Sequence, residues 1–246
     1  MKLEPEEASQ WVDEFLAKVT DFKDLDLDVA LCPSFVVIGN IYQKIKDTEF
    51  KLGSQDCFWE DDGSFTGEVS PKVLKSLGCE YAIIGHSERR YYFNESDEQV
   101  NLKVKAALRN DLIPIICVGE TFEERKEGRK DFVIMQQVQE AIKGLRLLGN
   151  DQLIVAYEPV WVIGSGQAVD PDEAEHANQV IRQTLLDNFP PEEVEEKTRI
   201  IYGGSVNPGN VQSFYDEPTI DGFLVGTASL EFESFSQIIK LYAKSL

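Results

Sequence analysis

The sequence predicts an α/β protein built on a parallel sheet, and two observations carry that prediction. Short apolar runs rich in β-branched residues recur at regular intervals, and they are continuous rather than alternating, which is typical of strands covered on both faces. Helical patterns separate these runs, so the order strand, helix, strand, helix indicates βαβ units. A chain of 246 residues suits one such domain, and we expect residues 1–246 to form it.

The elements follow one another along the whole chain. A helical pattern at 5–19 comes first and has no strand before it. Seven strand candidates then follow, at 28–32, 50–57, 81–85, 112–119, 152–158, 199–204 and 221–226. Clear helical patterns between them cover 132–148 and 171–189, whereas Pro190, Pro191 and the acidic residues after them predict a solvated connection. An eight-stranded barrel that begins at its first helix would have this order. A doubly wound sheet also accommodates seven strands, so periodicity leaves both architectures open.

Composition excludes several classes of partner. The formal net charge is −20, which argues against a nucleic acid or an anionic membrane as partner. The hydrophobic fraction of 42% is enough for a sizeable core. No apolar run approaches the roughly 18 residues of a membrane span, and the first ten residues are acidic, so we expect a cytoplasmic protein. The cysteines form no CxxC pair and are predicted to be reduced thiols rather than metal ligands: Cys32, Cys57, Cys79 and Cys117.

Two ionisable residues stand at the carboxyl ends of predicted strands, where α/β proteins place their chemistry. His86 directly follows 81–85, and Ser87 and Glu88 suit the cap and first turn of a following helix. A histidine that faces a helix N-terminus is biased towards its neutral form, which can donate a hydrogen bond. Glu158 ends 152–158 and is a candidate base. A loop-capping histidine and a salt-bridged glutamate are the plainer alternatives, and His176, in mid-helix, is predicted to be structural.

A loop suited to be a lid follows Glu158. It offers a stiffening proline, apolar cover and two glycines that permit unusual backbone angles. Such a lid would exclude water from a carboxylate base. Its residues are Pro159, Val160, Trp161, Val162, Ile163, Gly164, Ser165 and Gly166.

Glycines also mark the ends of the last two predicted strands. Gly203 and Gly204 follow 199–202, and Gly226 ends the run 221–226. Backbone amides at such positions can approach an anion closely, and barrels commonly hold phosphate at the loops after their last two strands. Two such turns in the last two units therefore favour an anion site.

Four segments, in this order along the chain, resemble the triosephosphate isomerase family. They are FTGEVSP (65–71), GHSERR (85–90), AYEPVWVIGSG (156–166) and YGGSV (202–206). The resemblance implies a (β/α)8 TIM barrel that acts as a homodimer. It also implies interconversion of dihydroxyacetone phosphate and D-glyceraldehyde 3-phosphate through an enediolate, as part of glycolysis and gluconeogenesis. The resemblance implies no metal and no organic cofactor.

Roles are carried over position by position. Glu158 resembles the family's proton-transferring base, His86 its neutral electrophile, Glu88 an acid near the floor of the site, and Cys117 a buried thiol that supports the base. The residues similar to the family's phosphate contacts are Gly164, Ser205, Gly204, Gly226 and Thr227. Residues 57–68 are similar to the loop that reaches into the partner subunit, with Phe65, Thr66 and Gly67 at its tip.

The chain departs from the family in two places. The resemblance begins one position after a lysine that the family carries at the end of its first strand. We therefore expect this chain to lack that strand, together with its asparagine and catalytic lysine. Thr227 stands where the family has a second glycine, and its β-branch restricts the backbone that would contact phosphate.

Two functions follow from these motifs. The first is triosephosphate isomerase activity, for which Glu158, His86 and the lid speak. The second is a non-catalytic, N-terminally truncated homolog that binds anions or partner molecules, which the missing lysine and Thr227 favour. Tight binding of a phosphorylated enediolate mimic that is lost in Glu158→Gln would separate them. Another phosphate-handling barrel, such as an aldose–ketose isomerase of amino-acid biosynthesis, fits the motif set poorly.

Overall fold

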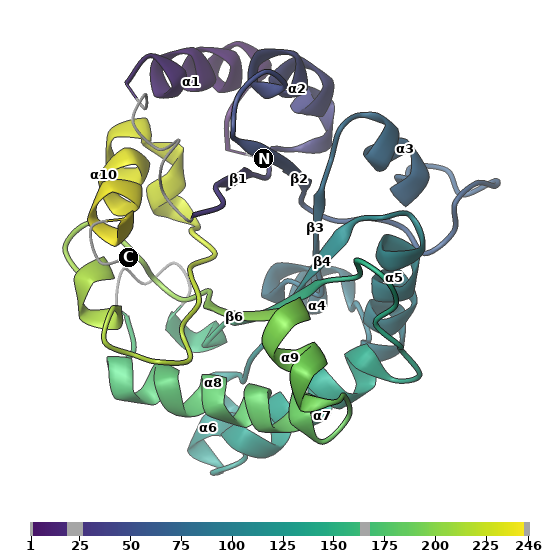
Figure 1. Cartoon of the computed structure of the whole chain (residues 1–246), viewed down its shortest axis with the longest axis vertical. Helices are drawn as coiled ribbons and strands as arrows, with labels where there is room; N and C mark the ends of the chain where they lie inside the picture. Colours follow the sequence, from purple (N-terminus) through teal and green to yellow (C-terminus); the bar gives the residue numbers. More distant parts are fainter. Residues whose placement is uncertain (1, 19–26, 163–167, 244–246) are drawn as a thin grey trace.

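The protein is a curled parallel sheet surrounded by helices (Figure 1). The computed structural model describes residues 2–18, 27–162 and 168–243. Within these ranges the sheet has six strands: β1 (Ala30–Leu31), β2 (Lys51–Ser54), β3 (Tyr81–Ile84), β4 (Ile113–Val118), β5 (Leu153–Tyr157) and β6 (Thr198–Tyr202).

The strand order decides between the two architectures that the sequence left open. Each strand pairs in parallel with the next one along the chain, in the order β1-β2-β3-β4-β5-β6. A doubly wound sheet would reverse direction at one point, whereas a barrel adds every strand on the same side. The order and the curl in Figure 1 therefore confirm the barrel topology. In the described part of the chain, residues 2–4 before the first helix add no strand beside β1.

The seventh predicted strand, at 221–226, is reduced to one isolated bridge between Tyr202 and Phe223. It still follows β6, because Tyr202 N donates to Gly222 O (2.9 Å) and Leu224 N donates to Tyr202 O (2.9 Å). The other predicted strands are confirmed with shorter bounds. The end of this segment therefore lies at the same edge of the sheet as the end of β6.

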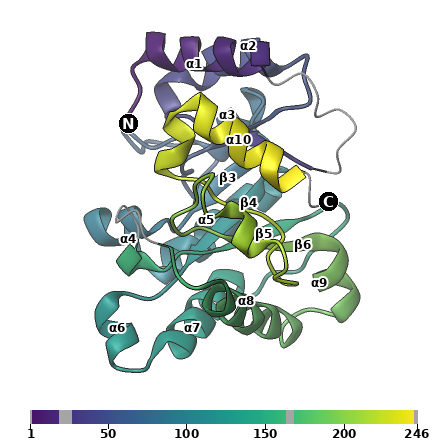
Figure 2. The ribbon, with the colours of Figure 1, turned by 90° about the vertical axis from the view of Figure 1, so that its left-hand side faces the viewer.

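Helices cover the outside of the curled sheet (Figures 1 and 2). They are α1 (Pro5–Lys18), α2 (Ile38–Ile45), α3 (Pro71–Ser76), α4 (Ser87–Phe93), α5 (Asp97–Arg109), α6 (Phe122–Lys126), α7 (Lys130–Ile142), α8 (Pro171–Leu186), α9 (Pro191–Lys197) and α10 (Phe232–Ala243). The first and last of these lie side by side in Figure 2 and meet through Trp11, Phe15 and Phe235, whose ring centroids are 4.9 to 5.9 Å apart. No helix in the described ranges combines the length and apolarity that crossing a bilayer requires.

The prediction of a solvated connection after Pro190 is wrong, because residues 191–197 form helix α9. Pro191 sits in its first turn with Glu192 and Glu193, and Lys197 is in its last turn. These charges complement the helix dipole, and proline is favoured at the first helical position. Val194 is buried and fixes the helix against its neighbours. The acidic run concealed this single apolar anchor.

Both faces of the sheet are packed, which explains the continuous apolar runs. Ile83, Ile115, Ala156 and Ile201 belong to a cluster inside the curl. Their neighbours along the strands belong to the larger core between sheet and helices, which includes Ile84, Ile116, Val155 and Tyr202. Successive side chains of a strand point to opposite faces. Alternate residues of each strand therefore pack into two different apolar clusters, and the strand sequences show no polar face.

Candidate active site

The two predicted catalytic residues, His86 and Glu158, lie together at the carboxyl ends of β3 and β5. Glu158 directly follows β5, and His86 is the second residue after β3. Nε2 of His86 lies 3.0 Å from Oε1 of Glu158, although the two residues are 72 positions apart. Glu158 is 2% exposed, whereas the side chain of His86 remains 26% exposed. The pair thus joins a buried carboxylate to a partly accessible imidazole, an arrangement suited to proton transfer.

Helix α4 fixes the tautomer of this histidine. Its N-cap is His86, whose Nδ1 accepts a hydrogen bond from the backbone N of Glu88 (3.2 Å). The neutral ring therefore carries its hydrogen on Nε2 and donates it towards Glu158. The prediction that Ser87 caps this helix is wrong. Instead, the backbone N of Ser87 donates to Oε2 of Glu158 (2.9 Å), so the second carboxylate oxygen is also held.

Two contacts act on the charge of His86 in opposite directions. Its Nδ1 accepts from Glu88 N, which requires the neutral ring, whereas the carboxylate of Glu158 beside Nε2 favours the charged ring, so the neutral form stays a prediction. Burial lowers the pKa of His86. The hydrogen bond and the charge of Glu158 together raise it by more than that, so the net shift of the pKa is upward. The contact with the carboxylate is direct, and an opposite charge at this distance favours the charged imidazole. The charge state of His86 therefore depends on whether Glu158 stays beside it.

Two glycines shape the place where the backbone of Glu158 lies. A Cβ on Gly119 would come within 2.6 Å of the carbonyl carbon of Glu158, and closer still to its oxygen. A Cβ on Gly203 would lie 3.0 Å from Cγ of Glu158. Hydrogen bonds from Glu158 N to Val118 O and from Gly203 N to Tyr157 O, both 2.7 Å, draw the three strand ends together. Only residues without a side chain allow this close approach.

The other residues assigned to the catalytic machinery lie at different depths. Cys117 is fully buried, and burial together with the nearby charge of Glu158 raises the pKa of its thiol. This agrees with a supporting position beneath the base. The side chain of Glu88 is 70% exposed, with Oε2 3.9 Å from Nδ1 of His86. It points to solvent rather than to a floor, and its catalytic role stays a prediction.

Only the first part of the predicted lid lies in the described chain. Val160–Val162 form a 3-10 helix after the buried Pro159. Trp161 donates from Nε1 to Oε1 of Glu120 (2.9 Å), and the backbone N of Val160 donates to the carbonyl O of Glu120 (3.2 Å). The rest of the lid, Ile163, Gly164, Ser165 and Gly166, lies outside the described residues.

Glu120 is a site residue that the sequence analysis missed. It is fully buried, and burial raises its pKa despite hydrogen bonds from Trp161 and Tyr157. The available signal was its position, because it follows the strand 112–119 as Glu158 ends the next strand. No motif pointed to it.

Four of the predicted phosphate contacts lie at one edge of the sheet, and the fifth, Gly164, is outside the described residues. Gly204 and Ser205 follow β6, and Gly226 and Thr227 end the neighbouring segment and begin a 3-10 helix, Thr227–Leu230. Gly226 and Thr227 are exposed, whereas Gly204 is buried and a Cβ there would lie 2.8 Å from Cε2 of Tyr202. Their meeting at this edge agrees with an anion site, and phosphate binding itself stays a prediction.

A buried cluster of four charged residues holds the turn at Gly85 that leads into His86. Nζ of Lys103 lies 2.7 Å from Asp56 and 2.6 Å from Glu95, and Arg89 contacts the same two carboxylates at 2.9 and 2.6 Å. The remaining oxygen of Glu95 accepts from the backbone N of Gly85 (3.1 Å). Burial raises the pKa of Asp56 to about 6 in spite of these cations. The sequence analysis identified none of these four charged residues.

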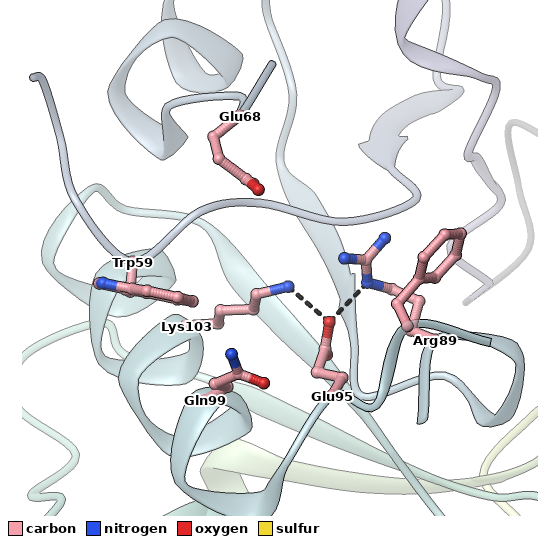
Figure 3. A pocket seen from close by; sticks show the side chains of 7 residues that line it. Trp59, Glu68, Arg89, Glu95, Gln99 and Lys103 are labelled. Atoms are coloured by element: carbon pink, nitrogen blue, oxygen red, sulfur yellow. Dashed lines mark hydrogen bonds and ion pairs between the residues drawn. The ribbon is translucent and has the colours of Figure 1, made fainter. Parts of the chain in front are cut away.

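The predicted interface loop, 57–68, covers this cluster. Figure 1 shows the segment between β2 and α3 projecting beyond α3. Trp59 and Glu68 line a pocket of about 210 Å³ above Arg89, Glu95 and Lys103 (Figure 3). Towards its tip, Phe65 is 44% exposed, and Thr66 and Gly67 are also exposed. The tip of the loop thus exposes apolar surface to solvent, whereas Trp59 and Glu68 lie beside the charged cluster.

The cysteines and acidic residues offer no clear metal site. In residues 2–18, 27–162 and 168–243, no group of three or more His, Cys, Asp or Glu side chains is placed to hold a metal ion. Cys57, Cys79 and Cys117 are buried free thiols, and Cys32 is partly buried.

The fold and site define a parallel α/β barrel with an acid–base pair at the carboxyl edge of its strands. Comparison with known proteins gives the family. A profile of the triosephosphate isomerase family matches residues 1–242, and the chain belongs to this family.

Several proteins named triosephosphate isomerase are similar to this chain. That of Endomicrobium trichonymphae is 46% identical over 219 residues, which cover 89% of this chain and 86% of that protein. That of Caldanaerobacter subterraneus subsp. tengcongensis is 44% identical over 235 residues, covering 96% and 93%. That of Dictyoglomus turgidum is 43% identical over 227 residues, covering 90% and 91%.

Proposed function

We propose that this protein is a triosephosphate isomerase, which interconverts dihydroxyacetone phosphate and D-glyceraldehyde 3-phosphate. The contact of 3.0 Å between His86 Nε2 and Glu158 Oε1 carries the proposal. The proposal takes Glu158 as a base and His86 as a hydrogen-bond donor, and side chains this close can meet one small substrate. Membership of the family supports the same substrate and reaction.

In this mechanism, Glu158 removes a proton from the carbon next to the substrate carbonyl and returns it to the neighbouring carbon. His86 donates from Nε2 to the carbonyl oxygen as the enediolate forms. The hydrogen bond from the N–H of Glu88 holds Nδ1 as acceptor, so the donor on Nε2 is preorganised. General base catalysis of this kind contributes roughly 10²- to 10⁴-fold to the rate.

The unliganded pair also explains how His86 becomes neutral for the reaction. A substrate that enters between the two residues breaks the contact through which Glu158 raises the pKa of His86. Once Glu158 has accepted the proton, its charge is gone as well. Burial and the charge of Arg89 then favour the neutral imidazole, opposed by the charge of Glu88.

The remaining assignments belong to the same proposal. The phosphate is bound by Gly164, Gly204, Ser205, Gly226 and Thr227, and residues 159–166 cover the bound substrate. The exposed loop 57–68 docks on a second copy, making the protein a homodimer that works in cytoplasmic glycolysis and gluconeogenesis. The exposed Phe65 on the projecting loop supports the dimer, because an interface would bury it.

A coupled assay of isomerisation by the full chain tests the proposal. We expect turnover in the wild type and a loss of at least about 10²-fold in kcat for Glu158→Gln, since the amide cannot accept the proton. Glu192→Gln, on the exposed start of α9, is the matched control and should leave kcat unchanged.

One observation favours the second candidate function, a non-catalytic homolog that binds anions. In the described residues, neither Glu158 nor His86 forms an ion pair with a lysine or arginine that would neutralise the enediolate. A wild-type chain that binds phosphoglycolohydroxamate, an enediolate mimic, but shows no turnover would refute isomerase activity and establish anion binding instead.

A further inference from the structure

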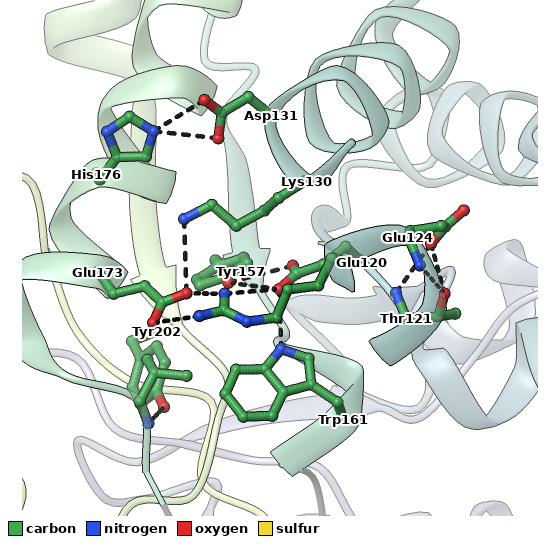
Figure 4. Close-up of polar contacts among 12 residues, drawn as sticks. Glu120, Thr121, Glu124, Lys130, Asp131, Tyr157, Trp161, Glu173, His176 and Tyr202 are labelled. Atoms are coloured by element: carbon green, nitrogen blue, oxygen red, sulfur yellow. Dashed lines mark hydrogen bonds and ion pairs between the residues drawn. The ribbon is translucent and has the colours of Figure 1, made fainter. Parts of the chain in front are cut away.

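We propose that Arg125 is a positioning residue for the base, because its guanidinium joins the backbone segment that carries Glu158 to helix α8. Nothing in the sequence motifs pointed to it. Figure 4 shows Glu120, Trp161 and Glu173 close together, although they come from three separate parts of the chain. Arg125 contacts all three. The inference rests on the proposed function, since it concerns how the base is held.

Glu120 accepts hydrogen bonds from residues on both sides of Glu158 in the chain. Its carboxylate accepts from the hydroxyl of Tyr157, the residue before the base, at 3.2 and 3.3 Å. It also accepts from Nε1 of Trp161, three residues after the base, at 2.9 Å. The carbonyl of Glu120 holds the amide of Val160. The backbone position of Glu158 is therefore tied to Glu120 through the residues before and after it.

The carboxylate of Glu120 needs a nearby cation, because it is fully buried. An isolated buried carboxylate is strongly disfavoured unless it is paired and hydrogen-bonded. Nη1 of Arg125 lies 3.8 Å from Oε1 of Glu120. The same guanidinium lies over the ring of Trp161, with Cζ 4.6 Å from the ring centroid. One group thus supports both the acceptor and one of its donors.

The other side of the guanidinium is fixed to α8. Both of its terminal nitrogens contact the carboxylate of Glu173, Nη1 to Oε1 and Nη2 to Oε2, the latter at 2.9 Å. A fork of this kind sets orientation as well as distance. Lys130 adds a second cation 3.7 Å from Glu173. Arg125 is thereby aimed at Glu120 and Trp161 by a rigid helix rather than by its own flexible stem.

Removal of the guanidinium would loosen Trp161 and leave Glu120 without its cation. The segment 157–161 would then lose its fixed place, and Glu158 with it. A base misplaced by about 1 Å can cost on the order of 10²-fold in rate. Four of the five predicted phosphate contacts, at 204–205 and 226–227, lie in other loops, and the fifth, Gly164, is outside the described residues. We therefore expect kcat to fall while KM stays within about threefold of wild type.

The test uses the full chain with Trp11→Phe and Trp59→Phe, so that Trp161 is the remaining tryptophan. In this background, Arg125→Met should shift the emission of Trp161 in the ligand-free protein and lower kcat by 10- to 100-fold. Arg125→Lys keeps the charge without the fork and should recover part of the loss. Glu173→Gln should act in the same direction. Arg129→Met, which removes an exposed partner of Glu127, is the matched control and should match the background.

Each outcome decides the question. Unchanged emission or unchanged kcat in Arg125→Met would overturn the inference, as would a loss that appears in KM alone. If Arg125→Met does not fold, Arg125→Lys and Glu173→Gln decide in its place by the same two measurements. A wild-type chain without turnover would instead refute the proposed function, and that result is separate because it needs neither the tryptophan substitutions nor an Arg125 variant.

Discussion

Gly119→Ala is the sharpest single perturbation of the site. The new Cβ would lie 2.6 Å from the carbonyl carbon of Glu158, whereas ordinary contact begins at 3.4 Å. The backbone of Gly119 cannot retreat easily, because its N–H donates to Oε1 of Gln137 (2.7 Å) and its carbonyl accepts from Nε2 of the same side chain (3.2 Å). Glu158 must therefore move by about 1 Å or more, since well-packed interiors transmit such strain.

A displacement of about 1 Å at a reacting group can cost on the order of 10²-fold in rate, so we expect kcat for triose phosphate isomerisation to fall by at least that factor. Overpacking should also lower the free energy of unfolding by about 1–3 kcal/mol, measured by urea denaturation. Gly39→Ala is the matched control, because no atom lies within 4 Å of a Cβ there. A Gly119→Ala enzyme with kcat within twofold of wild type would refute the reasoning.

Three further predictions concern the surroundings of the site. Lys103→Met should lower the free energy of unfolding in urea by about 3–5 kcal/mol, because two buried carboxylates lose their shared ammonium. Tyr202→Phe removes the hydroxyl that accepts from the amide of Val169 (3.3 Å) and should cost about 0.5–1.5 kcal/mol in the same assay. His86→Gln should destabilise the protein most below about pH 6.5, with the difference shrinking as pH rises, because Glu158 raises the folded-state pKa of the histidine.

Each of these predictions can fail. An unchanged urea midpoint for Lys103→Met would show that the buried carboxylates are satisfied without the ammonium. A loss above about 3 kcal/mol for Tyr202→Phe would mean that the hydroxyl does more than accept one hydrogen bond. For His86→Gln, a difference that grows with pH would show that the folded-state pKa is lowered rather than raised.

Some features were predictable from sequence because one physical cause dominated them. Strands packed on both faces give continuous apolar runs, and Glu158 and His86 were conspicuous as ionisable residues ending such runs. Helix α9 was missed because its single buried residue, Val194, stands within a charged stretch. The segment 221–226 looked like a strand by composition, but it makes only one bridge, to β6.

The supporting residues could not be predicted because their importance lies in contacts between distant segments. Glu120 and Arg125 look like ordinary charged residues until the fold places Trp161 and Glu173 beside them. The charge state of His86 was predicted from a local helix, whereas the fold also places a carboxylate 72 positions away beside its ring, and this carboxylate raises the pKa of His86. Local propensity cannot report such tertiary effects.

The most direct test of the central claim follows the proton that Glu158 moves. Dihydroxyacetone phosphate is incubated in D₂O with the wild-type chain or with Glu158→Gln, and incorporation of deuterium at carbon is followed by proton NMR. The account predicts rapid incorporation with the wild type and a rate lowered at least about 10²-fold in the variant. Incorporation at equal rates would show that Glu158 is not the base. No incorporation with the wild type would show that this chain does not form the enediolate.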